Sequence, residues 1–478
     1  MIQPHELVVV LPFAAALLLV ALPSYRVGAV VNVIASALTL AAGGWLVTSD
    51  RFAGDYAIVD EFNIVFVVIN TLVGFTTALF SAAYIGHEIE SGRLSPAFVR
   101  FYHAMFQAMM GSMNLALVAN NIGVMWVGLE LATLITVVMV GLYRTPQAIE
   151  AAWKYFILAS VGISLAFFGT ILIYLAGQPE LGEGVPAMTW SLLHGAANRL
   201  DPAILDLAFI FLLVGYGTKV GLAPLHAWLP DAHAEGPTPI SAVLSGLLLN
   251  VALYALLRFK MLVAAHPEAL NPGQVMVVMG LVSLIFAALM LYQRRDIKRL
   301  FAYSSIEHMG LMVFAFGLGG PLANFAGLLH MAMHSLTKSG IFFAVGHIAQ
   351  AKGTQRLADI TGLSVTHPRL AVLFALAVLA ICGLPPFGVF MSEFLILTTT
   401  FARDPWLALL PAFGLLVGFG ALLLRLQGTI FGEPAGPAHR VDGSFLPVIL
   451  HLALVLAAGI FLPPLLVAWF QRAAELLG

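Results

Sequence analysis

Four ionisable residues of this chain lie inside stretches that are otherwise apolar. Lys219 stands within residues 212–224, and Glu130, Lys338 and Glu393 have comparable surroundings. A lysine at the centre of a bilayer costs about 3 kcal/mol on insertion scales, and ionisable residues in such positions mark ion or proton paths when they face a protein interior. We therefore interpret these four residues as candidate proton-transfer groups inside a membrane.

Glu130 has polar neighbours on its own helix face. Thr133 and Thr136 follow it at helical spacing, so a polar stripe is expected to point toward the protein interior. The alternative is a glutamate near a helix end whose carboxylate reaches water. About nine residues of helix precede Glu130 and about ten follow it, which places it near the middle of a span.

Proline and glycine interrupt two spans close to their ionisable residues. The first break begins at Pro224, shortly after Lys219, and the second covers residues 383–388, just before Glu393. Backbone groups freed at membrane depth are tolerated only where protein or a water-filled cavity satisfies them. Two interrupted helices at corresponding places in two halves point to inverted repeats and to a transport site. A proline kink that serves packing alone is the alternative for each break.

His330, His334 and Lys338 follow one another at i, i+4 and i+8, so they share one helix face over about 12 Å. Neutral imidazole both donates and accepts hydrogen bonds and titrates near physiological pH, which suits stepwise proton transfer. Histidines at i and i+4 can also chelate zinc. We expect no bound metal, because no glutamate follows the first histidine and no cysteine lies nearby. Core histidines satisfied by hydrogen bonds are the remaining alternative.

Six further residues are accessory candidates: His226, Asp231, His233, Asn250, Glu307 and His308. Glu307 and His308 could extend the stripe of titratable groups through the preceding helix. Asp231 and His233 could give access to the path, although a loop cap is an equal alternative. Asn250 cannot titrate, but it could orient water or join two helices by a hydrogen bond.

These residues require long apolar elements to position them, and the composition supplies such elements. The chain has 478 residues, of which 60% are hydrophobic and 10% are charged, whereas soluble domains carry about 25% charged residues. We predict an all-α polytopic membrane protein with one integral domain over residues 1–478, and its first helix is expected to be retained. Roughly 14 spans are expected, centred near residues 14, 38, 73, 110, 131, 165, 212, 248, 282, 309, 336, 383, 417 and 458.

The basic residues predict the orientation of these spans. About 14 of them fall on one side of the membrane, and about 6 fall on the other. The first group is Arg26, Arg93, Arg100, Arg144, Lys154, Arg294, Arg295, Lys298, Arg299, Lys352, Arg356, Arg369, Arg425 and Arg440. The second group is Arg51, Arg199, Arg258, Lys260, Arg403 and Arg472. Because loops rich in Lys and Arg stay in the cytoplasm, both termini are expected on the non-cytoplasmic side.

Cys382 is the single cysteine, so an internal disulfide is excluded and no cysteine cluster exists for an iron-sulfur or zinc site. Any redox chemistry must therefore belong to a partner. We expect no cofactor in this chain, no nucleic-acid partner, and the lipid bilayer as its surroundings.

Three segments resemble the antiporter-like subunits of respiratory complex I and its relatives, which include Mrp antiporters. They are the helix around Glu130, residues 217–233 and residues 296–305, and the resemblance spans about residues 60 to 430. Within this superfamily, residues 304–310 and 334–339 look most like component F of hydrogenase-4 and related group 4 membrane hydrogenases.

The resemblance implies a fold of 14 helices with two inverted five-helix repeats, approximately 100–260 and 270–430, each with a broken helix. It also implies roles: Glu130 pairs with Lys219, Lys338 and its two histidines belong to a bridging helix, and Glu393 is the terminal ionisable residue. Asn250 departs from the family pattern, since pumping members commonly have Lys or His there.

The resemblance further implies proton translocation by a membrane subunit of a multi-subunit redox complex in the cell inner membrane. Separating Glu130 from Lys219 would release a proton toward the histidines, and moving one charge across 100 mV costs about 2.3 kcal/mol. Its partners would be other membrane subunits, including further antiporter-like ones, and a cytoplasmic redox or hydrogenase module. A non-pumping scaffold of such a complex is one alternative. A subunit of a cation/proton antiporter or of a solute-uptake assembly is another.

Overall fold

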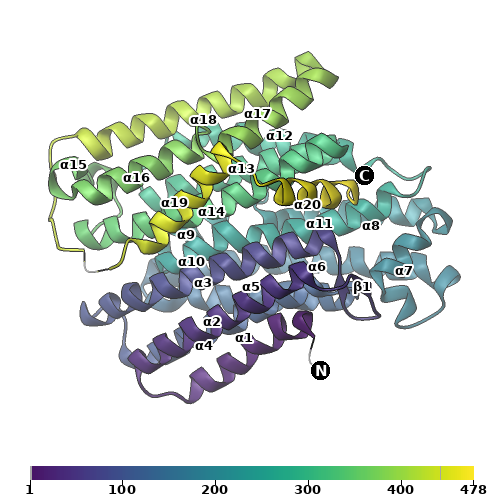
Figure 1. Ribbon diagram of the computed structural model, residues 1–478, viewed down its shortest axis with the longest axis horizontal. Helices are drawn as coiled ribbons and strands as arrows, with labels where there is room; N and C mark the ends of the chain where they lie inside the picture. Colours follow the sequence, from purple (N-terminus) through teal and green to yellow (C-terminus); the bar gives the residue numbers. More distant parts are fainter. Residues whose placement is uncertain (1–2, 442) are drawn as a thin grey trace.

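Long helices form almost the whole of the computed structural model, which describes residues 3–441 and 443–478 (Figure 1). Up to the middle of the chain the elements are α1 (Pro4–Ala21), α2 (Tyr25–Thr48), β1 (Phe52–Ala53), β2 (Ile58–Val59), α3 (Glu61–Glu90), α4 (Pro96–Val118), α5 (Ile122–Val140), η1 (Gly141–Tyr143), α6 (Pro146–Leu181), η2 (Pro186–Met188), α7 (Trp190–Gly195), η3 (Ala197–Arg199), α8 (Pro202–Val220), α9 (Leu229–Glu235), α10 (Thr238–Val243), η4 (Leu244–Leu248) and α11 (Leu249–Ala264). The two short strands pair antiparallel.

The remaining elements are α12 (Pro272–Leu291), α13 (Ile297–Leu318), α14 (Pro321–Lys352), η5 (Leu357–Asp359), α15 (Leu363–Thr366), α16 (Pro368–Ile381), α17 (Gly388–Arg403), α18 (Pro405–Phe431), α19 (Leu446–Ile460) and α20 (Pro464–Glu475). Local sequence signals set many of these boundaries. Asp201, for example, caps α8 by accepting hydrogen bonds from two backbone amides of its first turn, and Pro202 occupies the first helical position.

The predicted all-helical membrane architecture is confirmed. In the described part of the chain, 10 helices are long and apolar enough to cross a membrane, or up to 11 if α19 and α20, which meet at 85°, form one span. Of the predicted span centres, the one near residue 383 falls between α16 and α17, and every other lies inside a helix. The predicted number of 14 spans stays a prediction. Helices α4 and α14 are not among the 10 candidate spans, and α16 is an apolar helix shorter than those spans.

The two most deeply buried of these spans carry the candidates Asn250, Glu307 and His308. The continuous helix of α10, η4 and α11 is fully buried over its most apolar window, and α13 is 94% buried, whereas α1 and α18 are each 33% buried. Figure 1 shows α1 and α18 at opposite edges of the bundle, with α13 and α14 between them. The candidate groups on the central helices are therefore enclosed by protein.

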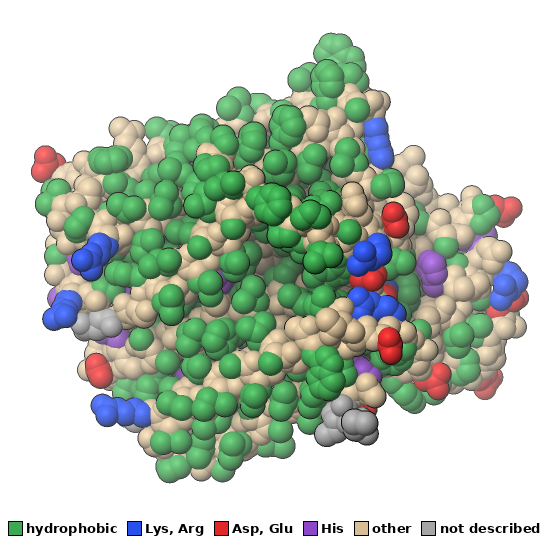
Figure 2. All heavy atoms as spheres, in the orientation of Figure 1, with side chains coloured by type: hydrophobic (Ala, Val, Ile, Leu, Met, Phe, Trp, Pro, Cys, Tyr) green, Lys and Arg blue, Asp and Glu red, His purple; other side chains and the backbone are tan. Residues whose placement is uncertain are grey.

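Apolar and charged side chains separate on the surface. Figure 2 shows hydrophobic side chains across the middle of the visible face and charged side chains toward its two ends. The helices run between these ends, and α1 begins and α20 ends on the half of the bundle that carries β1 (Figure 1). A band of this kind matches a bilayer flanked by water.

Candidate functional site

Lys219 and Glu130 meet between α8 and α5. The Lys219 side chain is 2% exposed, and its Nζ lies 3.5 Å from Oε2 of Glu130. The same Nζ donates a shorter hydrogen bond of 2.5 Å to Oγ1 of Thr133, on the face of α5 that carries Glu130. The structure thus brings together the two residues that the sequence pairs, and Thr133 adds a neutral partner. Lys219 also occupies the last turn of α8, where the helix dipole favours a cation.

The predicted first break follows Lys219 directly. Helix α8 ends at Val220, and Gly221 has φ of 82°, a left-handed conformation that glycine adopts readily. Protein groups satisfy the backbone that the break exposes, because Trp228 Nε1 donates to the Thr218 carbonyl at 2.8 Å and Ser283 Oγ accepts from the Ala223 amide at 2.9 Å. The Thr218 carbonyl and the Ala223 amide are therefore both satisfied at the break that follows Lys219.

Asn250 joins two central helices. Its Nδ2 donates to Ser335 Oγ on α14 at 2.7 Å and to the Gly246 carbonyl at 2.9 Å, within the π-helical segment η4. Its Oδ1 has no hydrogen-bond partner in the described chain. Of the two roles considered for Asn250, the structure shows the helix-joining one directly.

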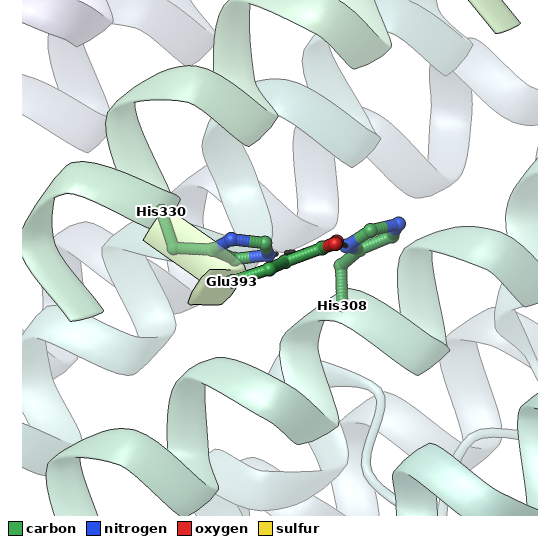
Figure 3. Close-up of side chains that lie close together, drawn as sticks. All are labelled: His308, His330 and Glu393. Atoms are coloured by element: carbon green, nitrogen blue, oxygen red, sulfur yellow. Dashed lines mark hydrogen bonds and ion pairs between the residues drawn. The ribbon is translucent and has the colours of Figure 1, made fainter. Parts of the chain in front are cut away.

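Three helices converge on a cluster formed by His308, His330 and Glu393 (Figure 3). His308 on α13 and His330 on α14 approach within 3.1 Å between Nδ1 and Nε2, and Glu393 Oε1 on α17 lies 3.8 Å from His308 Nδ1. The second nitrogen of His330, Nδ1, lies 2.9 Å from Ser392 Oγ. Sequence reasoning missed Ser392, although it directly precedes Glu393 and the adjacency offered a signal.

Lys338 and His334 lie on the same buried face of α14 as His330. Lys338 Nζ donates to the Phe301 carbonyl of α13 at 3.1 Å and lies 5.7 Å from the centre of the Phe301 ring. Neither ring nitrogen of His334 has a hydrogen-bond partner among the described residues. Along α14, His334 lies between His330 and Lys338. The centre of its ring is 5.6 Å from the centre of the His308 ring, so His334 is also close to the cluster in space.

Glycines make room for two buried carboxylates. A Cβ at Gly418 on α18 would lie 1.9 Å from Oε1 of Glu307, and a Cβ at Gly383 would lie 1.9 Å from Oε2 of Glu393. Gly383 belongs to the second break, where α16 ends and α17 has not begun. Gly383 lies in the break that the sequence predicts just before Glu393, whereas the contact of Gly418 was beyond sequence reasoning, because Glu307 is distant along the chain.

The remaining accessory residues lie apart from these groups. His226 packs against the rings of Phe286 and Tyr303, and His233 stacks on a phenylalanine ring at 4.9 Å. Asp231 forms ion pairs with Lys154 at 3.2 Å and Arg299 at 3.1 Å. Asp231 therefore belongs to a partly exposed charge network, and its side chain forms no hydrogen bond or ion pair with His233 in the described chain.

Comparisons with known proteins agree with this architecture. Residues 119–419 match the family described as NADH:quinone oxidoreductase/Mrp antiporter, transmembrane. The chain belongs to this family. It is 58% identical over 470 residues to a hydrogenase-4 component F homolog of Methylacidiphilum infernorum, covering 98% of this chain and 99% of that one. The resemblance seen in the motifs is thereby confirmed.

The chain is more distantly similar to chains of several other complexes. The chain is 28% identical to NAD(P)H-quinone oxidoreductase chain 4 of Gloeobacter violaceus, over 76% of this chain and 67% of that one. A chain of the archaeal membrane-bound sulfane sulfur reductase superposes with a TM-score of 0.88 at 22% identity, covering 99% of this chain and 97% of that one. A chain of the Mrp complex from Dietzia superposes with a TM-score of 0.86 at 20% identity, covering 100% and 98%. These structural similarities show a shared fold.

Proposed function

We propose that this chain translocates protons as an antiporter-like membrane subunit of a multi-subunit redox complex, related to group 4 hydrogenases or complex I. One observation carries the proposal: the buried Nζ of Lys219 lies against Glu130 and Thr133 beside a break in its helix. A buried cation with a carboxylate partner can hold a proton while the two are paired and release it when they separate.

The proposed route leads from Lys219 to the groups on α13, α14 and α17. Lys338, His334 and His330 follow one another on α14, and His330 contacts His308. Glu393 would be the terminal group, since it lies beside His308 at the second break. Helix α11, which carries Asn250, packs against α8, and Asn250 contacts Ser335 on α14. Because Asn250 cannot titrate, the proposed route needs water to carry the proton from α8 to α14.

The remaining features of the proposal concern the membrane and the partners. The chain would cross the inner membrane 14 times as a single domain, with inverted repeats near 100–260 and 270–430 and both termini on the non-cytoplasmic side. The two breaks, one beside Lys219 and one beside Glu393, support two equivalent repeats. Further antiporter-like subunits and a cytoplasmic redox or hydrogenase module would be its partners. Its similarity to a hydrogenase-4 component F homolog and to a chain of an archaeal respiratory membrane complex supports a place in a multi-subunit membrane assembly.

A second candidate function is a membrane scaffold that does not pump. Asn250 favours it, because this residue joins two helices by its hydrogen bond to Ser335 and cannot itself titrate. In a scaffold, the complex would fall apart without this subunit, while variants of the buried charges would leave electron transfer at full rate and uncoupled from protons.

The test is proton translocation by the purified complex in proteoliposomes. Lys219→Met and Glu130→Gln should each remove most proton translocation. Lys260→Met is the matched control, because Lys260 is another buried lysine, whose Nζ donates to the Leu477 carbonyl at 2.9 Å. Unchanged translocation in both Lys219→Met and Glu130→Gln would refute the proposal. A requirement for sodium would instead favour a cation/proton antiporter.

A further inference from the structure

The cluster of His308, His330 and Glu393 has the donor atoms of a transition-metal site. We propose that these three side chains bind one divalent transition-metal ion, with Zn²⁺ as the ion that best fits their imidazole and carboxylate ligands. Zinc is commonly held by two histidines and one carboxylate, with a further position left open. The sequence alone did not predict that these three residues meet, because they lie on three different helices.

The distances between the ligand atoms suit one ion. Zinc lies about 2.0–2.1 Å from imidazole nitrogen and about 2.0–2.2 Å from carboxylate oxygen, so neighbouring ligand atoms in a tetrahedral site are roughly 3.4 Å apart. His308 Nδ1 is 3.1 Å from His330 Nε2 and 3.8 Å from Glu393 Oε1. All three ligand atoms lie within 4.8 Å of one another. Small side-chain adjustments would therefore bring them around one metal ion.

The hydroxyl group of Ser392 orients the His330 ring as a metal ligand. The Ser392 hydroxyl donates to the Val389 carbonyl at 2.8 Å, so its oxygen is left to accept from His330 Nδ1 at 2.9 Å. This arrangement places the ring proton of His330 on Nδ1 and leaves the lone pair of Nε2 directed at His308. Hydrogen bonds of this kind, from the second nitrogen of a ligating histidine, orient metal ligands in proteins.

His308 must present Nδ1 without a proton when the ion binds. Without a metal, Nδ1–H of His308 donates to His330 Nε2; with a metal, the remaining proton of the neutral ring sits on Nε2. No proton is lost in this exchange of tautomers. The fourth position would be left to water, because His334, whose ring centre is 5.6 Å from that of His308, lies outside the group of ligand atoms within 4.8 Å of one another.

Charge and access also favour a cation at this place. The carboxylate of Glu393 offsets part of its charge, and Oε2 of Glu307, the residue before His308, has no hydrogen-bond partner in the described chain. Lys338, one helical turn beyond His334, opposes it. Glu393 retains 11% side-chain exposure beside the second break, whereas His308 retains 2%, so the carboxylate is the more accessible of these two ligands.

The consequence of binding rests on the proposed function. An ion held by His308, His330 and Glu393 occupies the atoms that would accept and donate the proton at the end of the route. Zinc would therefore block proton translocation by this subunit.

The experiment measures zinc bound to the purified complex after dialysis, as the difference between the native complex and its variants. His308→Gln and Glu393→Gln should each bind one ion fewer per copy of this chain. His347→Gln is the matched control, since His347 is a buried histidine of α14 outside the cluster, and it should bind as the native complex does. Ser392→Ala, a mild change, should weaken zinc affinity about 10–100-fold because it removes the partner of His330.

Cobalt provides a second readout that needs no variant. Co²⁺ bound at the cluster should give the visible d–d absorption of a tetrahedral nitrogen and oxygen site, and zinc should displace it. Equal zinc in the native, His308→Gln and Glu393→Gln complexes, without this cobalt signal, would overturn the proposal. Zinc that binds as expected without slowing proton translocation would uphold the metal site and count against the proposed route through the cluster.

Discussion

Asn250 donates a 2.7 Å hydrogen bond to Ser335, and this bond joins α11 to α14. Ser335 directly follows His334 on α14. Asn250 departs from the family pattern, in which Lys or His is common at this position. An amide there holds the two helices together but cannot carry a proton itself. Any proton that passes from Lys219 to Lys338 must therefore travel through water that polar side chains orient.

Replacing Asn250 with leucine tests this arrangement. Asn250→Leu removes the hydrogen bond and the polar surface while nearly keeping the volume, so proton translocation should fall about tenfold, equivalent to roughly 1.4 kcal/mol. Stability should fall by about 0.6–1.7 kcal/mol, the range found for side-chain hydrogen bonds between membrane helices. Translocation in proteoliposomes and thermal unfolding of the complex measure the two effects.

Asn70 provides the control for this change. Its Nδ2 donates to Asn114 Oδ1 at 2.7 Å, in a buried pair between α3 and α4 that lies outside the proposed route. Asn70→Leu should cost similar stability and leave translocation unchanged. Equal translocation by the Asn250→Leu and native complexes would contradict a role for Asn250 in the route.

The hydroxyl group of Thr133 is expected to stabilise the folded protein by accepting a hydrogen bond from the buried Lys219. Thr133→Val keeps the shape of the side chain but leaves Lys219 with Glu130 alone, at 3.5 Å. Leaving a buried donor without its partner costs about 1–3 kcal/mol, so the free energy of unfolding should fall by about that amount. Chemical denaturation of the purified complex, followed by tryptophan fluorescence, measures the change.

Thr39 shows what the same substitution does without a buried lysine. Its hydroxyl donates to the Ala35 carbonyl within its own helix at 2.8 Å, so Thr39→Val should alter stability by less than about 0.5 kcal/mol. A loss in Thr133→Val no larger than that in Thr39→Val would show that Lys219 gains little from the Thr133 hydroxyl.

Gly418 should be intolerant of even one added carbon atom. Gly418→Ala places a Cβ 1.9 Å from Glu307 Oε1, so Glu307 or α18 must move, and overpacking of this kind costs about 1–3 kcal/mol. Gly428 lies on the same helix with nothing within 4 Å of its Cβ position, and Gly428→Ala should be neutral or slightly stabilising. Thermal unfolding of both variants measures the difference, and equal melting temperatures would show that Glu307 has room to turn away.

The sequence predicted the helices, the two breaks and the buried charges because each depends on local composition. Apolar length, Pro224, and the charge at Lys219 or Glu393 are visible in a short stretch of residues. The contacts of Ser392, Gly418 and Asn250 were not predictable in this way. They depend on which faces of distant helices meet, and helical periodicity gives the face of a residue but not its partner on another helix.

The orientation in the membrane can be decided with single cysteines. In a Cys382→Ser background, Glu183→Cys and Arg356→Cys place one thiol at each end of the bundle, on exposed residues between α6 and α7 and after α14. The excess of Lys and Arg near residue 356 predicts that this end is cytoplasmic. A membrane-impermeant maleimide should therefore label position 183 in intact cells, and label position 356 only in inverted membrane vesicles. Both termini share the half of the bundle that carries β1, so the reverse labelling pattern would place them in the cytoplasm and reverse the direction of the proposed proton route.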